Sequence, residues 1–106
     1  MYINANDKKY CIQISKYKST NVSGENVVYF IEAKKAIILN KTGTIIWDMI
    51  NIPDSDGTVD IEDITSKIMS EFGYDADLHD RVRDDIFVPL RKLSENGLIT
   101  LEEISE

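Results

Sequence analysis

The sequence of 106 residues lacks several features that would fix its location or its chemistry. Cys11 is the only cysteine, so no disulfide can form within the chain, and nothing around it suggests a metal site. No apolar run approaches the roughly 20 residues that a membrane helix requires, and the first residues lack the apolar centre of a signal peptide. We therefore expect a cytoplasmic protein that does not enter a membrane.

Residues that usually carry catalysis are also scarce. His79 is the only histidine, and its charged neighbours favour a solvated helix surface over the role of general base. Cys11 has no histidine near it in sequence to activate its thiol. The five glycines are scattered and form no phosphate-binding loop, and the acidic residues between positions 54 and 63 lack the spacing of a calcium loop. The sequence predicts that the protein is not an enzyme and holds no metal or cofactor.

Positive charge is in short supply, because the formal net charge is −7. This balance argues against nucleic acid as a partner, since a polyanion requires a dense cationic face. The charges are unevenly spread: residues 1–42 hold seven basic and three acidic side chains, whereas residues 43–106 hold five basic and sixteen acidic ones. A groove between these halves would present both signs to a partner, although an unevenly charged solvated surface explains the numbers more simply.

The first part of the chain predicts three strands. Residues 10–15 alternate so that Tyr10, Ile12 and Ile14 share one side, and residues 27–31 are continuously apolar and rich in branched and aromatic side chains. After the short polar segment 32–35, residues 36–39 should turn back as the last strand of a meander, at an edge of the sheet. The polar residues 18–21 between the first two strands are expected to form a loop.

From residue 40 the apolar residues recur at helical spacing. Asn40 or Thr42 can cap a first helix, which should stop at Pro53, Asp54 and Gly57. A second helix is expected to begin after Asp60 as its cap and to end at Gly73. The apolar face of this second helix comprises Ile61, Ile64, Ile68 and Phe72.

A third helix is expected to begin at Asp75 or Asp77 and to end in a left-handed cap at Asn96 and Gly97. Pro89 interrupts it, because proline lacks the N–H that would bond to the carbonyl of Asp85, so a kink near Asp85 is predicted. Its predicted core face comprises Leu78, Val82, Ile86, Leu90 and Leu93. Leu98 and Ile99 should then be buried, and residues 102–106 should form a frayed tail.

The order of three strands and three helices resembles the PqqD-like family of peptide-recognition elements in ribosomal peptide modification pathways. The resemblance is carried by residues 37–47, which read Ile-Ile-Leu-Asn-Lys-Thr-Gly-Thr-Ile-Ile-Trp, and by residues 59–64, 85–93 and 96–99. Pro89 departs from the family pattern, which more often has a large apolar residue there. The resemblance implies an α+β, winged-helix-like fold in which a three-stranded antiparallel sheet precedes three helices. The length of the chain and its apolar content of 42% predict a single domain of residues 1–106, with its core at about 10–99 and frayed ends.

The resemblance further implies a function. The chain would bind the leader segment of a ribosomally synthesised precursor peptide as a strand added beside residues 36–39. It would then present that leader to a separate modifying enzyme, often a radical SAM enzyme, or to a leader protease. An exposed pair of Phe87 and Val88 between arginines would suit an apolar and acidic peptide, and burial of Phe87 under the amino-terminal strand is the alternative. The predicted peptide-binding residues are Lys34, Lys35, Ala36, Ile37, Ile38, Leu39, Arg83, Phe87, Val88 and Arg91.

Two other functions stay open on the sequence alone. The helical half is compatible with a winged-helix transcriptional regulator, although the aspartates of the third helix oppose contact with nucleic acid. The chain is also compatible with a structural adaptor that holds an enzyme subunit without touching a peptide. Leader binding in the absence of the enzyme would separate the adaptor from the peptide-binding protein.

Overall fold

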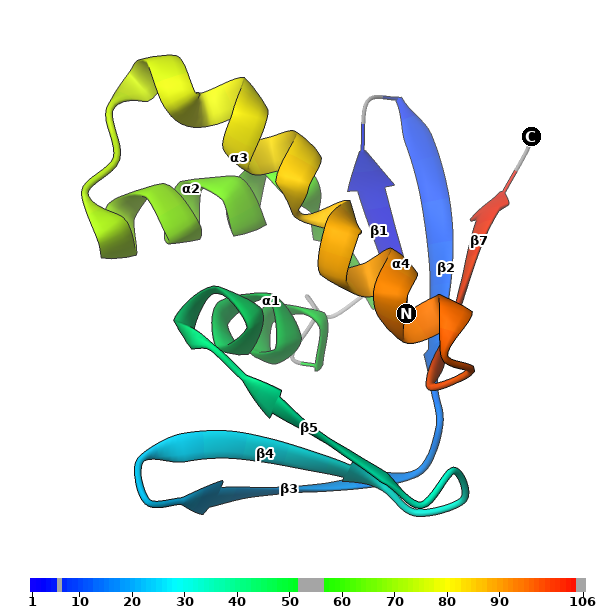
Figure 1. Cartoon of the computed structure of the whole chain (residues 1–106). Helices are drawn as coiled ribbons and strands as arrows, with labels where there is room; N and C mark the ends of the chain where they lie inside the picture. The colour runs from blue at the N-terminus through cyan, green and yellow to red at the C-terminus, as the bar shows by residue number, and fades with distance from the viewer. Residues whose placement is uncertain (6, 52–56, 105–106) are drawn as a thin grey trace.

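The structure, a computed structural model, describes residues 1–5, 7–51 and 57–104. Within these residues the fold is α+β and contains two sheets with helices packed against them, as Figure 1 shows. A three-stranded antiparallel sheet precedes the helices, as the sequence predicts. It comprises β3 (Tyr17–Val22), β4 (Glu25–Phe30) and β5 (Lys35–Leu39), with β4 in the centre.

The predicted strands at 27–31 and 36–39 are confirmed as β4 and β5, but the loop predicted at 18–21 is wrong, because these residues form β3. Ser23 and Gly24 join β3 to β4, and both have positive φ, 53° and 84°. A two-residue turn of this kind matches the right-handed twist of the strands that it connects. β3 shows no apolar alternation because it lies at the sheet edge, with five of its six side chains exposed.

The strand predicted around Tyr10 exists as β2 (Lys8–Ile14), but it belongs to a second sheet and not to the meander. This four-stranded sheet has the order β6 (Thr58–Asp60), β1 (Tyr2–Ala5), β2 and β7 (Ile99–Ile104). β1 runs parallel to β6 and antiparallel to β2, and β2 runs antiparallel to β7. The sheet therefore joins the two ends of the described chain.

The prediction of frayed ends is wrong for most of both termini. β1 buries Ile3 completely, and β7 buries Ile99, so both ends gain backbone pairing and apolar contacts. Neither strand is conspicuous in the sequence, because each finds its partners only after distant segments come together. Residues 105 and 106 of the predicted tail lie outside the described residues.

The first two helices begin where the sequence predicts. In α1 (Lys41–Asn51), the Asn40 Oδ1 atom accepts the N–H of Gly43 at 2.7 Å, so Asn40 is the cap. The end predicted for this helix at Pro53 and Asp54 lies outside the described residues. In α2 (Ile61–Phe72), the Asp60 carboxylate accepts the N–H of Glu62 at 2.9 Å, and Gly73 ends the helix with φ 65°.

The third predicted helix is divided into η1 (Ala76–Leu78), α3 (His79–Asp85) and α4 (Phe87–Glu95). The predicted kink is confirmed: the helix changes its pattern at Ile86, whose N–H bonds to the carbonyl of Arg83 at 3.3 Å. Pro89 thereby falls in the first turn of α4, where its missing N–H would have no helical partner anyway. Leu78, predicted in the core, is exposed because η1 does not continue the helical period of α3.

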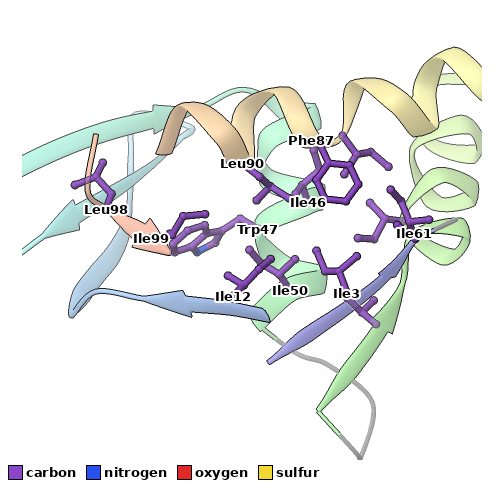
Figure 2. Close-up of a cluster of buried hydrophobic side chains, with 14 of the residues drawn as sticks. Ile3, Ile12, Ile46, Trp47, Ile50, Ile61, Phe87, Leu90, Leu98 and Ile99 are labelled. Atoms are coloured by element: carbon purple, nitrogen blue, oxygen red, sulfur yellow. The ribbon is translucent and has the colours of Figure 1, made fainter. Parts of the chain in front are cut away.

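One hydrophobic core fills the space between the sheets and the helices. Figure 2 shows its side chains converging from β1, β2, α1, α2, α4 and the start of β7. Trp47 is buried and packs edge-on against Tyr17 and Phe30, with ring centroids 5.0 and 6.0 Å away. Leu98 and Ile99 are buried, as the sequence predicts. Among the described residues, none of the helices combines the length and the apolar character needed to cross a membrane.

Candidate functional site

An apolar groove lies beside the outer edge of β5. In the part of the chain that the structure describes, β5 pairs with β4 and with no other strand. The two-residue turn makes Val22 and Glu25 a doubly hydrogen-bonded pair, and such pairs alternate along the sheet. The registers then direct the backbone groups of Lys35, Ile37 and Leu39 toward β4. The N–H and C=O groups of Ala36 and Ile38 are consequently directed toward the free edge.

The side chains of β5 alternate across the sheet. Ile37 and Leu39 are half-buried and pack on the hydrophobic core, whereas Ile38 is 66% exposed. Ile38 thus directs its backbone groups toward the edge and its apolar side chain toward the solvent.

A groove of about 620 Å³ separates β5 from α4. β5 forms one wall, and one face of α4 forms the other. Its apolar lining includes Ile37 and Leu39 from β5, and Leu93 and Leu98 from the other side. The full lining is residues 35–40 with Gly43, Pro89, Lys92, Leu93, Asn96 and Leu98.

The polar groups of the groove are cationic or neutral. Lys35 and Lys92 stand on opposite walls, and no acidic side chain occurs among the lining residues. Asn40 already uses its carboxamide oxygen as a helix cap, and the Asn96 Nδ2 atom donates to the carbonyl of Lys92 at 2.8 Å. An extended peptide with acidic and apolar side chains fits this set of groups, because the strand edge supplies backbone hydrogen bonds and the lysines supply positive charge.

The groove brings together only part of the predicted site. Lys35 to Leu39 line it, and Lys34 lies next to it in the β4–β5 turn with φ 54°. Val88 is exposed on α4 but does not line the groove. Sequence reasoning missed the wall that α4 contributes, namely Pro89, Lys92, Leu93 and Asn96. The helical spacing of these four residues could have indicated that they share one face of the helix. Leu93, however, belongs to the predicted core face.

The predicted exposure of Phe87 is wrong. Phe87 is only 8% exposed and packs against Tyr10 of β2, with ring centroids 5.0 Å apart. The Arg91 guanidinium lies over the outer side of the same ring, 5.7 Å from its centroid. Phe87 and Arg91 therefore face the four-stranded sheet and not the groove, which agrees with the alternative of burial under an amino-terminal strand.

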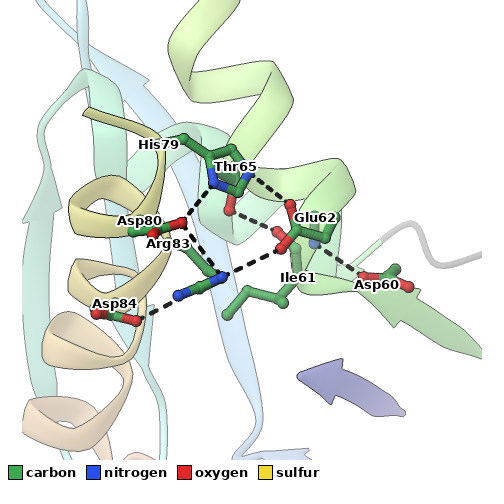
Figure 3. Close-up of polar contacts among 8 residues, drawn as sticks. All are labelled: Asp60, Ile61, Glu62, Thr65, His79, Asp80, Arg83 and Asp84. Atoms are coloured by element: carbon green, nitrogen blue, oxygen red, sulfur yellow. Dashed lines mark hydrogen bonds and ion pairs between the residues drawn. The ribbon is translucent and has the colours of Figure 1, made fainter. Parts of the chain in front are cut away.

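Arg83 lies in a separate polar cluster that joins α2 to α3 (Figure 3). Its guanidinium is within 4 Å of carboxylates on Glu62, Asp80 and Asp84. The two ring nitrogens of His79 contact Asp80 at 3.0 Å and Glu62 at 2.6 Å. Hydrogen bonds to Asp80 and then to Glu62 raise the pKa of His79, and the bond to His79 lowers the pKa of Asp80. The cluster fixes one helix against another and does not line the groove.

The described residues contain no group of three or more histidine, cysteine, aspartate or glutamate side chains that is placed to hold a metal ion. Cys11 is a free, half-buried thiol in β2. The groove beside β5 is therefore the candidate functional site.

The comparisons give one match. The family model described as "Coenzyme PQQ synthesis protein D (PqqD)" matches residues 25–99. The matched segment begins at β4 and contains β5 and α4, so it includes both walls of the groove, whereas β1, β2 and β3 precede it. Searches among curated proteins and among solved structures found no match.

Proposed function

The chain belongs to the PqqD family, which is involved in binding the precursor peptide of PQQ, and we propose that it binds the leader segment of a ribosomally made precursor peptide. The leader adds to the three-stranded sheet as a strand beside β5, within the groove that α4 closes. The chain then presents the leader to a separate modifying enzyme, such as a radical SAM enzyme, or to a leader protease.

The observation that carries this proposal is the free edge of β5. Ala36 and Ile38 direct unpaired backbone groups toward a groove with apolar walls. Strand addition draws most of its affinity from such backbone groups and its selectivity from pockets for alternate side chains. The five residues of β5 span about 17 Å, so they offer a template for a peptide of similar length.

The charges around the groove support an acidic leader. Lys34, Lys35 and Lys92 surround the groove or line it, and all three are exposed. Local positive potential attracts an acidic peptide even though the whole chain has a net charge of −7, because screening limits each field to about 8–10 Å. The aspartates of α3 are exposed and argue against nucleic acid as the ligand.

In the proposed function the chain has no catalytic activity of its own and holds a peptide for a separate enzyme. A cytoplasmic location follows from the proposed ligand, because precursor peptides are made on ribosomes. The residues proposed to contact the leader are Lys34 to Leu39, together with the α4 wall of Pro89, Lys92, Leu93 and Asn96.

Calorimetric titration of the full chain with the synthetic leader of a precursor encoded beside it tests the proposal. We expect a dissociation constant between micromolar and nanomolar, or about −8 to −12 kcal/mol, without any enzyme present. Absence of heat and of competition at high micromolar leader would overturn the proposal. Leader binding without the enzyme would also exclude the pure adaptor.

A further inference from the structure

The outer face of the three-stranded sheet exposes apolar side chains that no element of the described chain covers. The registers place Thr20, Val27 and Ile38 in one row across the strands, and Lys18, Tyr29 and Ala36 in the next. Val22, Tyr29 and Ile38 are 53%, 42% and 66% exposed. Figure 1 shows α1 over one side of this sheet, and no described element covers the other. We call the surface of Val22, Val27, Tyr29 and Ile38 the outer patch.

Three lysines flank the outer patch at one end. Lys16 lies directly before β3, Lys18 lies in β3, and Lys34 lies in the β4–β5 turn. All three are exposed, and among the described residues none of them forms an ion pair. By contrast, Lys8 and Lys67 on other surfaces do pair with glutamates. The partner that suits the outer patch has an apolar surface flanked by carboxylates.

The outer patch is continuous with the edge to which the leader is proposed to add. Ile38 offers its backbone groups to the edge and its side chain to the outer patch. Side chains alternate between the two faces of a strand, so a peptide added to β5 turns every second side chain to the outer face. The bound leader would thus enlarge the outer patch by one strand.

We propose that the outer patch, extended by the bound leader, docks the enzyme that modifies the precursor. This inference rests on the proposed function, because the leader beside β5 enlarges the docking surface. The enzyme contacts Tyr29 and Val27 directly and pairs carboxylates with Lys18 and Lys34. It also contacts the outward side chains of the leader, so it binds the loaded protein more tightly than the empty one. The two faces of one sheet then have different tasks: the inner face packs on the core, and the outer face selects the enzyme.

Binding measurements with Tyr29→Ser, Lys18→Glu and the modifying enzyme encoded beside the precursor test this docking face. We expect each substitution to weaken enzyme binding by about tenfold for Tyr29 and several-fold for Lys18, as is usual for an aromatic anchor and a rim charge. Leader affinity should stay within about twofold of the wild-type value, because neither side chain lines the groove. Bound leader should strengthen enzyme binding by about fivefold or more, a common size for coupling between two sites.

Matched substitutions elsewhere provide the controls. Tyr74 is 43% exposed, close to the 42% of Tyr29, but it stacks on Phe72 and does not belong to the outer patch. Tyr74→Ser should therefore leave enzyme binding unchanged. Arg81→Glu makes the same change of charge as Lys18→Glu on α3, which lies outside the sheet.

Enzyme binding that is the same in Tyr29→Ser and in the wild type would overturn the docking face. Sedimentation that shows a wild-type dimer and a Tyr29→Ser monomer would also overturn it, because the outer patch would then hold a second copy of the chain. Failure of the wild-type chain to bind leader would instead contradict the proposed function, and enzyme binding measured without leader would still test the outer patch.

Discussion

Among the described residues, β7 of the four-stranded sheet and β5 of the three-stranded sheet each pair with a strand on one side only, but the two edges carry different side chains. β7 of the four-stranded sheet carries Glu102 and Glu103, whereas β5 is uncharged from Ala36 to Leu39. Charged side chains on an edge strand discourage pairing with another chain, and an uncharged apolar edge invites it. This difference supports the proposal that a leader adds as a strand beside β5.

The sheets also differ in how the chain builds them. β3, β4 and β5 are neighbours in sequence and are joined by short turns, whereas the other sheet brings residues 2–14 beside residues 58–60 and 99–104. The four-stranded sheet buries Ile3, Ile12 and Ile99 and covers Phe87. Its contacts therefore stabilise the core, whereas the proposed leader binding uses only the three-stranded sheet and α4. Four predictions test this division.

The largest effect is expected from truncation in the four-stranded sheet. Ile3 and Ile12 are 0% and 1% exposed, so Ile3→Ala or Ile12→Ala should lower the free energy of unfolding by about 2–4 kcal/mol. Urea denaturation followed by circular dichroism measures the change. The folded fraction should keep the wild-type leader affinity, and a folded Ile3→Ala variant that no longer binds leader would contradict the division of roles.

The next largest effect is expected at the edge of β5. Ile38→Pro removes an N–H that points away from β4, so leader affinity should fall by about tenfold while the sheet stays intact. Ile37→Pro removes an N–H that bonds to β4 and should unfold the hairpin, which circular dichroism would detect. Cys11→Ser and His79→Ala serve as controls with wild-type affinity. Equal leader affinity in folded Ile38→Pro and in both controls would show that the leader does not bind beside β5.

A smaller effect is expected from charge beside the groove. The double substitution Lys34→Glu and Lys35→Glu should slow association with an acidic leader several-fold, since exposed charges contribute less than about 1 kcal/mol each. The salt dependence of the association rate should become flatter, and the free energy of unfolding should change little. Stopped-flow measurements at low and high salt test this. An unchanged rate at low salt would show that the lysines only protect the edge from aggregation.

The smallest effect is expected from the cluster around His79. Its contacts with Asp80 and Glu62 raise its pKa, so the stabilisation is fully present below about pH 6.5 and is lost as the pH rises through the folded-state pKa. Unfolding measured from pH 6 to pH 9 should show a small loss of stability in the wild type. His79→Gln should remove that pH dependence and leave leader affinity unchanged. A wild-type curve that rises over this range would contradict the assignment.

Much of the fold could be predicted because its signals are local. The caps Asn40 and Asp60, the left-handed Gly73 and the kink caused by Pro89 each depend on neighbours within a few residues. β3 was missed because a polar edge strand has no apolar period, and its pairing depends on the turn at Ser23 and Gly24. Part of the site, Lys35 to Leu39, could be predicted for the same reason that β5 could.

The opposite wall of the groove could not be predicted in the same way. Which face of α4 meets the core depends on what covers Phe87, and that cover is Tyr10 from a strand more than seventy residues earlier in the chain. The sequence by itself determined β4, β5, the starts of α1 and α2, the composition of the open edge and the family. Only the tertiary structure decided that both chain ends form one sheet and that Lys92, Leu93 and Asn96 face β5. The physical reason is that backbone caps and periods act over a few residues, whereas burial is decided by surfaces that meet only when the whole chain has folded.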